Sequence, residues 1–235
     1  MKCGCSTNCD CQSFPQGGQL VRNLNSQIDT LRQELASEQE TVYCYSMTSI
    51  KNRHGHFVQT GCGPNFQGDL ITMCTCRPDI RAYMDVDSWI GKWVAGFKCL
   101  EADENGNALV YLMKVAQAFE SQYDFWFAAT IPQATKQAKV THLHECGDVY
   151  EPRSEDGDPF DPQHYIPPRA DHVHYTPGNR WHRDINYVGR KTGHRAALLV
   201  GDPQYSFLWA KPMLFYPSKH PRMKKRELQA LLGQL

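Results

Sequence analysis

The sequence predicts an α+β domain built around a curved, mostly antiparallel sheet. Short β-prone runs recur along the middle of the chain, separated by loops that hold many of its 17 glycines and 14 prolines. This pattern is typical of strands joined by turns. Apolar residues at helical spacing are concentrated near the two ends of the chain instead. With 235 residues to bury one substantial core, we expect a few helices around this sheet, preceded by an amphipathic helix.

The composition is that of a soluble globular protein, with 41% hydrophobic and 21% charged residues. Basic and acidic residues balance at 25 each, so a polyanionic partner must be bound by a local patch, which argues against a tail-driven DNA-binding protein. The apolar runs fall well short of the roughly 20 residues that span a bilayer. The first residues also lack the apolar stretch of a secretory signal. We therefore expect a cytoplasmic protein without a membrane partner.

Residues 1–18 form a cysteine-rich, loop-like segment. Four of the ten cysteines stand in two pairs, Cys3-x-Cys5 and Cys9-x-Cys11. Their thiolates could bind one metal, for which zinc is the candidate, although structural zinc sites usually leave at least two residues between paired cysteines. The alternative is a thiol-rich terminus that becomes ordered only through contact with a partner.

Residues 19–41 carry the apolar stripe of an amphipathic helix. Its members recur every three or four residues. They are Leu20, Leu24, Ile28, Leu31 and Leu35. The stripe either packs on the chain's own domain or forms a coiled coil that makes a homo-oligomer through residues 20–40. The sequence leaves both alternatives open.

Residues 42–217 form the main body, most of which is predicted to be sheet. Strands are expected at 42–47, 70–75, 88–97, 108–119, 196–200 and 208–215. A glycine-broken hairpin or loop is expected at 51–68, and a helix is expected around 80–84. The aromatic cluster at 123–127 either begins a helix or covers the core.

Two further segments are distinguished by their charge. Residues 145–161 carry seven acidic side chains against one arginine, which predicts an exposed loop. Residues 218–235 begin with a basic run and end in an amphipathic stretch, which we interpret as a C-terminal tail outside the main body.

Three motifs in the main body carry a resemblance. They are Gly-Pro-Asn-Phe-Gln-Gly at 63–68, Thr-Cys-Arg-Pro-Asp-Ile-Arg at 75–81 and Asp-Ser-Trp-Ile at 87–90. An apolar strand at 109–115 and a histidine-rich region follow them. Over residues 42–217 the chain resembles the nucleotide modification associated domain 2 (Nmad2) family. One departure is Asp87-Ser88, where the family has Gly-Asp before the tryptophan.

The resemblance implies an association with enzymes that install or process modified nucleobases, often in phages and bacterial defence loci. It supplies a context and no reaction. The same order of motifs is similar, at the level of the fold, to PUA-type barrels, which include readers of modified bases. A PUA-like β-barrel is therefore the alternative form of the predicted sheet.

A nucleobase site needs aromatic faces for stacking, polar groups for the base edge and cations for the phosphates. The candidate substrate-binding residues are Asn65, Phe66, Arg77, Arg81, Trp89 and Trp181. Asn65 offers an edge reader beside the ring of Phe66. Arg77 and Arg81 flank the expected start of a helix, which suits a phosphate. The alternatives are an ordinary turn for Asn65 and a structural ion pair for Arg81.

The candidate catalytic residues are His182, Asp184 and Cys76. His182 could act as an acid or base, oriented by Asp184 if a turn brings the two together, and a surface ion pair is the alternative. Cys76 could act as a nucleophile if a histidine lies within reach, and a small buried side chain is the alternative. The His-x-His pairs, with Cys146, could also complete a metal site.

The sequence therefore predicts a protein that binds a nucleotide, or a modified DNA or RNA base, and is associated with nucleobase modification. Two alternatives stay open, a non-catalytic reader of modified bases and a metal-stabilised assembly protein. The residues do not decide between an enzyme and a reader. We expect Asn65, Phe66, Arg81, His182 and Asp184 to converge on one concave surface.

Overall fold

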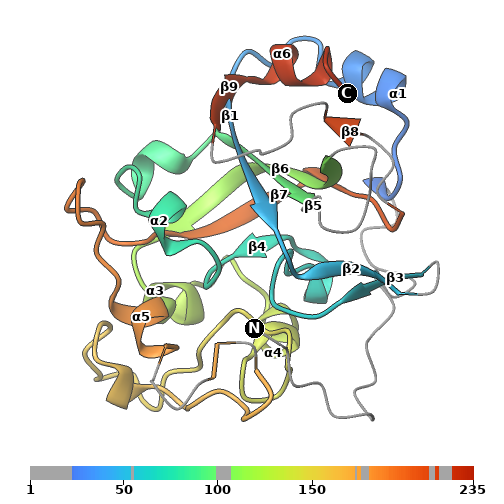
Figure 1. Cartoon of the computed structure of the whole chain (residues 1–235). Coiled ribbons are helices and arrows are strands. Elements are labelled where there is room, and N and C mark those ends of the chain that lie inside the picture. The colour runs from blue at the N-terminus through green and yellow to red at the C-terminus, as the bar shows by residue number, and fades with distance from the viewer. Residues whose placement is uncertain are drawn as a thin grey trace.

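The central sheet has seven strands. They are β1 (Thr41–Met47), β4 (Thr72–Met73), β5 (Trp93–Lys98), β6 (Asn107–Phe119), β7 (Leu198–Leu208), β8 (Phe215–Tyr216) and β9 (Lys224–Glu227). The structure is a computed structural model that describes residues 23–53, 56–98, 107–172, 174–175, 180–211, 215–216 and 224–235. Figure 1 shows the strands crossing the middle of the molecule, with β9 at one end of the sheet.

The sheet is mostly antiparallel and open. Its order is β4-β7-β6-β5-β1-β9, with β8 beside β6. β1 and β5 run parallel, and the other pairs run antiparallel. Within the described residues the two edges, β4 and β9, do not pair with each other, so the sheet does not close into a barrel. The predicted mixed α+β class is confirmed.

Side chains of β1 alternate between two apolar clusters, as the two-residue period of a strand requires. Val42 and Cys44 belong to one cluster, whereas Tyr43 and Tyr45 belong to the other. The first seven residues of β6 are all buried, because this central strand is covered on both faces. The sheet is therefore the core of the molecule.

Helix α1 (Ile28–Glu34) is shorter than the predicted helix at 19–41. Leu24 forms an isolated bridge with Leu208 in β7, and Asn25 has a φ of 58°, so residues 24–27, directly before α1, are not helical. Leu31 and Leu35 are fully buried in a cluster with the leucines of α6 (Leu228–Leu232). This part of the apolar stripe packs on the chain's own domain.

Residues 224–227 join the central sheet, although 218–235 was expected to be a tail outside the main body. β9 pairs with β1 from Thr41 to Cys44, and α6 follows it directly. The strand expected at 88–97 also differs, because a 3-10 turn at Asp87–Trp89 precedes the start of β5 at Trp93.

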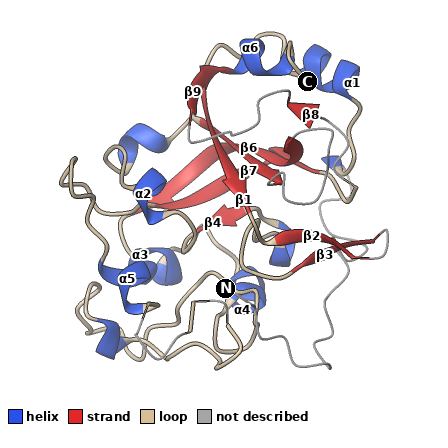
Figure 2. Ribbon diagram, viewed as in Figure 1, coloured by secondary structure: helices blue, strands red, loops and turns tan. Residues whose placement is uncertain are grey.

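The remaining described elements lie around the central sheet. They are the hairpin β2 (Ile50–Arg53) and β3 (His56–Gln59), the helices α2 (Pro78–Arg81), α3 (Gln122–Phe127), α4 (Gln133–Lys139) and α5 (His182–Asn186), and 3-10 turns at Gln67–Asp69 and Pro162–His164. α3 begins at a capping box in which Ser121 and Asp124 each accept from the other's backbone N–H. Figure 2 shows α3, α4 and α5 gathered beyond one end of the strands and joined by long loops.

The charge of the acidic segment at 145–161 predicts an exposed loop, but part of this segment is buried in the structure. Asp148 is buried, and its carboxylate accepts hydrogen bonds from the Thr72 hydroxyl at 3.0 Å and the Cys74 backbone N–H at 3.1 Å. These bonds tie the segment to β4.

No helix among the described residues has both the length and the apolar character needed to cross a bilayer.

Candidate functional site

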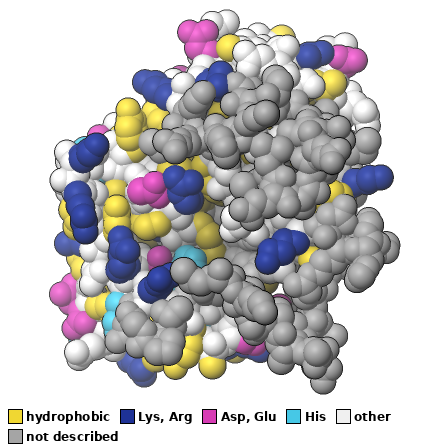
Figure 3. Space-filling model, viewed as in Figure 1, with side chains coloured by type: hydrophobic (Ala, Val, Ile, Leu, Met, Phe, Trp, Pro, Cys, Tyr) yellow, Lys and Arg dark blue, Asp and Glu magenta, His cyan; other side chains and the backbone are white. Residues whose placement is uncertain are grey.

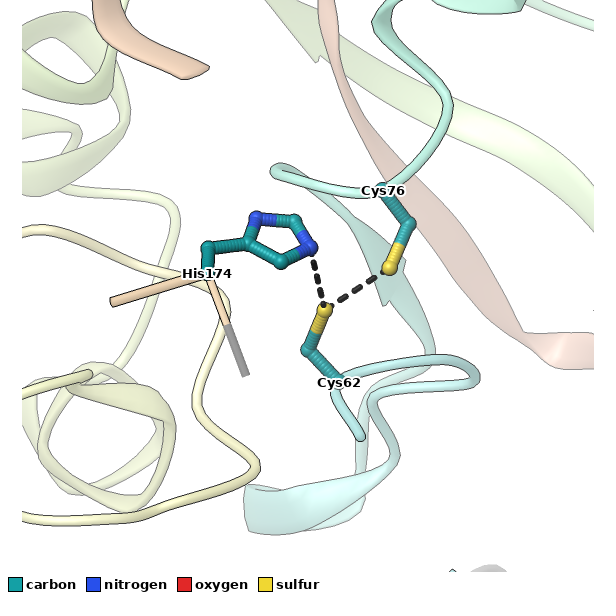
Figure 4. Close-up of side chains that lie close together, drawn as sticks. All are labelled: Cys62, Cys76 and His174. Carbon is teal, nitrogen blue, oxygen red and sulfur yellow. Dashed lines mark hydrogen bonds between the residues drawn. The ribbon is translucent and has the colours of Figure 1, made fainter. Parts of the chain in front are cut away.

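Three segments far apart in the sequence bring Cys62, Cys76 and His174 together (Figure 4). Cys62 lies in the loop after β3, Cys76 in the turn between β4 and α2, and His174 in the loop before α5. The Cys62 sulfur is 2.7 Å from the Cys76 sulfur and 3.7 Å from His174 Nε2. Their three donor atoms lie within 4.8 Å of one another. These residues are termed the thiol-histidine centre.

The loop that carries Cys62 is held by Gln59. The Gln59 amide donates to the carbonyl oxygens of Gly61 at 2.7 Å and Pro64 at 2.9 Å, on either side of Cys62. The Thr75 hydroxyl donates to the Cys62 sulfur at 3.2 Å. Since Gln59 and Thr75 are both buried, the position of this sulfur is fixed from two directions.

The turn that carries Cys76 is held by Arg81. The Arg81 guanidinium donates to the carbonyl oxygens of Thr75 and Cys76, and also to those of Ala196 and Ala197 just before β7. Arg81 is fully buried. This predicted phosphate-binding residue therefore uses its donors inside the protein, where it anchors the Cys76 turn to the sheet.

His174 is oriented by Asp184 on α5. The Asp184 carboxylate lies 2.6 Å from His174 Nδ1 and also accepts a hydrogen bond from the Tyr150 hydroxyl at 3.0 Å. A carboxylate can only accept, so Nδ1 carries the hydrogen. In the neutral ring the lone pair is then on Nε2, the nitrogen that faces Cys62.

Electrostatics in the centre favour a positive charge. The hydrogen bond with Cys76, together with burial, raises the pKa of the Cys62 thiol. Burial lowers the pKa of His174, but a negative charge on Cys62 and the hydrogen bond to Asp184 raise it, and the net shift is upward. Two sulfurs and a carboxylate thus surround one imidazole, and a cation among them is stabilised.

The arrangement suits two kinds of chemistry. Two thiolates and an imidazole are ligands that zinc prefers. A thiol beside an imidazole whose other nitrogen is held by a carboxylate is also the arrangement of a nucleophilic cysteine. Both kinds require a deprotonated sulfur.

Two of the three predicted catalytic residues lie at this centre. Cys76 is one of its members and Asp184 orients another. His182 is half-buried on α5 with its ring 4.1 Å from that of Trp181. The expected pairing of His182 with Asp184 is replaced by the pairing of Asp184 with His174.

The predicted pair Asn65 and Phe66 is buried. The Asn65 side chain accepts a hydrogen bond from the Lys139 ammonium at 2.5 Å and donates one to the Cys146 carbonyl at 2.9 Å. Phe66 packs in the apolar cluster that also contains Tyr45. The polar groups of Asn65 are thus engaged within the protein.

The other predicted substrate-binding residues have contacts of their own. Arg77 forms an ion pair with Asp79 at 2.8 Å and remains partly exposed. Trp89 is fully buried, with its indole N–H donating to the Arg81 carbonyl at 3.0 Å. Trp181 is buried with its ring 5.6 Å from that of Tyr150. The Trp89 and Trp181 side chains are therefore part of the packed interior of the domain.

The predicted metal ligands Cys3, Cys5, Cys9 and Cys11 lie outside the described residues. Within the described residues the thiol-histidine centre is the one group of three or more potential metal ligands, so His142, His144 and Cys146 do not form another. Sequence reasoning missed Cys62, which lies 112 residues from His174. The histidine pair at 172–174 was the available signal.

Residues 180–195 present basic side chains on and around α5, the helix that supplies Asp184 to this centre. Arg180, Arg183, Arg190 and Lys191 are exposed, whereas Asp184, the one acidic residue in the stretch, is buried against His174. Figure 3 shows Lys and Arg side chains gathered on the left of the view, where Figure 1 places α5 and the turn that follows it. Residues 180–195 are termed the basic segment.

Comparison with known proteins gives one match. The family model described as nucleotide modification associated domain 2 matches residues 56–176. Cys62, Cys76 and His174 all lie inside this stretch, and Asp184 lies beyond it. Neither the curated proteins nor the solved structures include a match to the chain.

Proposed function

The chain belongs to the nucleotide modification associated domain 2 family, and we propose that it binds a nucleotide whose base undergoes modification. In this proposal the nucleotide is free or part of a nucleic acid. Its base lies at the thiol-histidine centre and its phosphates lie on the basic segment. The family match supports the nucleotide context, and the charges around α5 support the placement.

The two faces of α5 carry the proposal. The buried face supplies Asp184 to the thiol-histidine centre, and the exposed face supplies Arg183 to solvent. A phosphate bound at Arg183 is therefore held by the same short helix that orients His174. Phosphate contacts fix the position of a nucleotide, while groups farther in act on its base.

A stacking face is also available beside the centre. Tyr175 follows His174 directly and is 43% exposed. Because Phe66, Trp89 and Trp181 are buried, Tyr175 is a better candidate for contact with a base than the aromatic residues expected from the sequence. Stacking on a tyrosine ring is tolerant of base identity.

We favour a reactive site over a non-catalytic reader. A reader needs a pocket and a groove, but it does not need coupled titratable groups. The centre instead combines two thiols, an imidazole and an orienting carboxylate. The assembly alternative is less well supported, because Leu31 and Leu35 of the helical stripe are covered within the chain.

Binding of a short fluorescent single-stranded oligonucleotide, measured by anisotropy over a range of salt concentrations, tests this proposal. Arg183→Gln should weaken binding and reduce the slope of log affinity against log salt by about one. Lys225→Gln is the matched control, since Lys225 is an exposed cation on β9 at the far end of the sheet. Equal effects of the two substitutions, or no binding of oligonucleotide or nucleotide by the unmodified chain, would show the proposal to be wrong.

A further inference from the structure

We propose that Cys62, Cys76 and His174 bind one zinc ion and leave its fourth coordination position open. The donor set consists of two sulfurs and one imidazole nitrogen, all supplied by loops that the sheet and α5 hold in place. Zinc is the metal that best matches such a mixed sulfur and nitrogen set. Three protein ligands with a free position are typical of zinc sites that bind water or substrate.

One distance in the centre already fits zinc, and another requires a small movement. Tetrahedral zinc places a sulfur and a nitrogen ligand about 3.6 Å apart, and Cys62 Sγ lies 3.7 Å from His174 Nε2. Two sulfur ligands should be about 3.8 Å apart, whereas the sulfurs of Cys62 and Cys76 lie 2.7 Å apart. Zinc binding must therefore separate the two sulfurs by about 1 Å.

The groups around the ligands give an independent argument for a metal. Histidine ligands of zinc commonly donate their second N–H to a carboxylate, and Asp184 is in that position 2.6 Å from His174 Nδ1. Tyr150 in turn donates to Asp184, and Thr75 donates to the Cys62 sulfur. Such outer contacts fix the orientation of the ligand side chains. Three side chains that met by chance would not need to be held in this way.

The described residues supply no fourth ligand. Among the described residues, no further histidine, cysteine or carboxylate shares the 4.8 Å group. The Asp184 carboxylate is engaged at Nδ1, on the opposite edge of the ring from Nε2. A Lewis acid at this place would lie beside the base in the proposed function, so the inference deepens that proposal by naming its chemistry.

Metal content of the full chain, purified without chelator, tests the inference. We expect about one equivalent of zinc to be lost in Cys62→Ser and in His174→Ala, while Cys9→Ser with Cys11→Ser leaves that equivalent in place. Cys76→His supplies an alternative ligand and should retain zinc, which separates loss of a ligand from loss of the fold. After replacement of zinc by Co²⁺, sulfur-to-metal charge-transfer absorption should weaken in Cys62→Ser.

Asp184→Asn tests the positioning role of the carboxylate, with an expected loss of zinc affinity of about 10- to 100-fold. Zinc that follows Cys9 and Cys11 alone would overturn the inference, as would a disulfide between Cys62 and Cys76 in zinc-free protein purified without reductant. Zinc binding without nucleotide binding would contradict the proposed function only. Nucleotide binding by a chain that takes up no zinc at this site would contradict the metal inference only.

Discussion

The Nε atom of Arg81 donates a hydrogen bond to the carbonyl oxygen of Cys76 at 2.9 Å. The same guanidinium donates to the carbonyls of Thr75, Ala196 and Ala197. Burial lowers the pKa of Arg81, since a charged group is less stable away from water. Four carbonyl dipoles offset that cost and join the Cys76 turn to the sheet. The thiol-histidine centre thus depends on a buried cation beneath it.

We expect Arg81→Met to lower the free energy of unfolding by about 3–5 kcal/mol, because four buried carbonyls lose a charged donor. Chemical denaturation near neutral pH measures this. Arg77→Met is the matched control, four residues away, where a partly exposed ion pair with Asp79 should contribute less than about 1 kcal/mol. A small and equal loss in both variants would contradict a structural role for Arg81.

Lys139 predicts a pH-dependent term in stability. Its buried ammonium donates to Asn65 Oδ1 and to the Leu70 carbonyl, and burial lowers its pKa from 10.5 to about 8. Between these two values the unfolded chain binds a proton that the folded chain does not. The contribution of Lys139 to stability must therefore rise with pH across that window.

The Lys139→Met variant isolates this term, because all other titrating groups are common to both proteins. The free energy of unfolding of the unmodified chain, minus that of Lys139→Met, should increase between pH 8 and pH 10.5. The steepest slope should be about 1.4 kcal/mol per pH unit. Denaturant titrations at several pH values measure it. A difference that stays constant with pH, or falls, is inconsistent with a depressed pKa.

The strands were predictable from sequence where burial produces a simple pattern. β1 alternates between two clusters and β6 is apolar on both faces, so both were expected close to their observed bounds. Strands were expected at 196–200 and 208–215, which leaves Gly201, Asp202 and Pro203 outside them. In the structure the chain continues through them, and the pairing with β6 shifts register between Val115 and Met113. These residues lie at an irregularity in the pairing of β7 with β6, and a sequence pattern does not distinguish such a bulge from a turn.

The candidate site was predictable only in part. Chemistry singled out Cys76 and Asp184, and both contribute to the centre. Their partners, Cys62 and His174, come from distant loops, and no local pattern indicates which loops meet. Arg81 was predicted from its residue type and lies elsewhere than expected. An arginine suits phosphate binding, but on α2 its side chain is buried against the carbonyls of Ala196 and Ala197. Residue type therefore predicts what a side chain can do, and tertiary contacts decide where it does so.

Tyr175→Ala should weaken binding of a labelled oligonucleotide by about 5- to 150-fold, the range that corresponds to about 1–3 kcal/mol for one stacked base. The reason is that Tyr175 is an exposed aromatic residue that directly follows His174 in the chain. Tyr83→Ala is the control, since Tyr83 is 45% exposed but lies near α2 with its ring 5.8 Å from that of Tyr43. Anisotropy titrations at one fixed salt concentration compare the two. Equal effects, or none at Tyr175, would remove Tyr175 from the proposed base contact.

Tyr150 and Tyr165 allow a paired test of the hydrogen bonds behind the proposed zinc site. Both side chains are buried, but the Tyr150 hydroxyl donates to Asp184, whereas the Tyr165 hydroxyl donates to the Pro159 carbonyl at 2.6 Å. Replacement by Phe keeps the ring and removes one hydroxyl in each case. Because Asp184 orients His174, Tyr150→Phe should lower zinc affinity by up to about tenfold, the lower end of the range for groups outside the ligand set.

Tyr165→Phe should leave zinc affinity unchanged, since its hydroxyl donates to the Pro159 carbonyl and not to Asp184. Competition with a chromophoric chelator measures both affinities on folded protein, and thermal unfolding checks that the two variants are equally folded. If Tyr150→Phe bound zinc as tightly as the unmodified chain, the link from Tyr150 through Asp184 to His174 would not act on the metal. If both variants lost affinity alike, the effect would come from general loosening of the core. Of the two hydroxyls, that of Tyr150 bonds to Asp184, so a loss through Asp184 should appear in Tyr150→Phe alone.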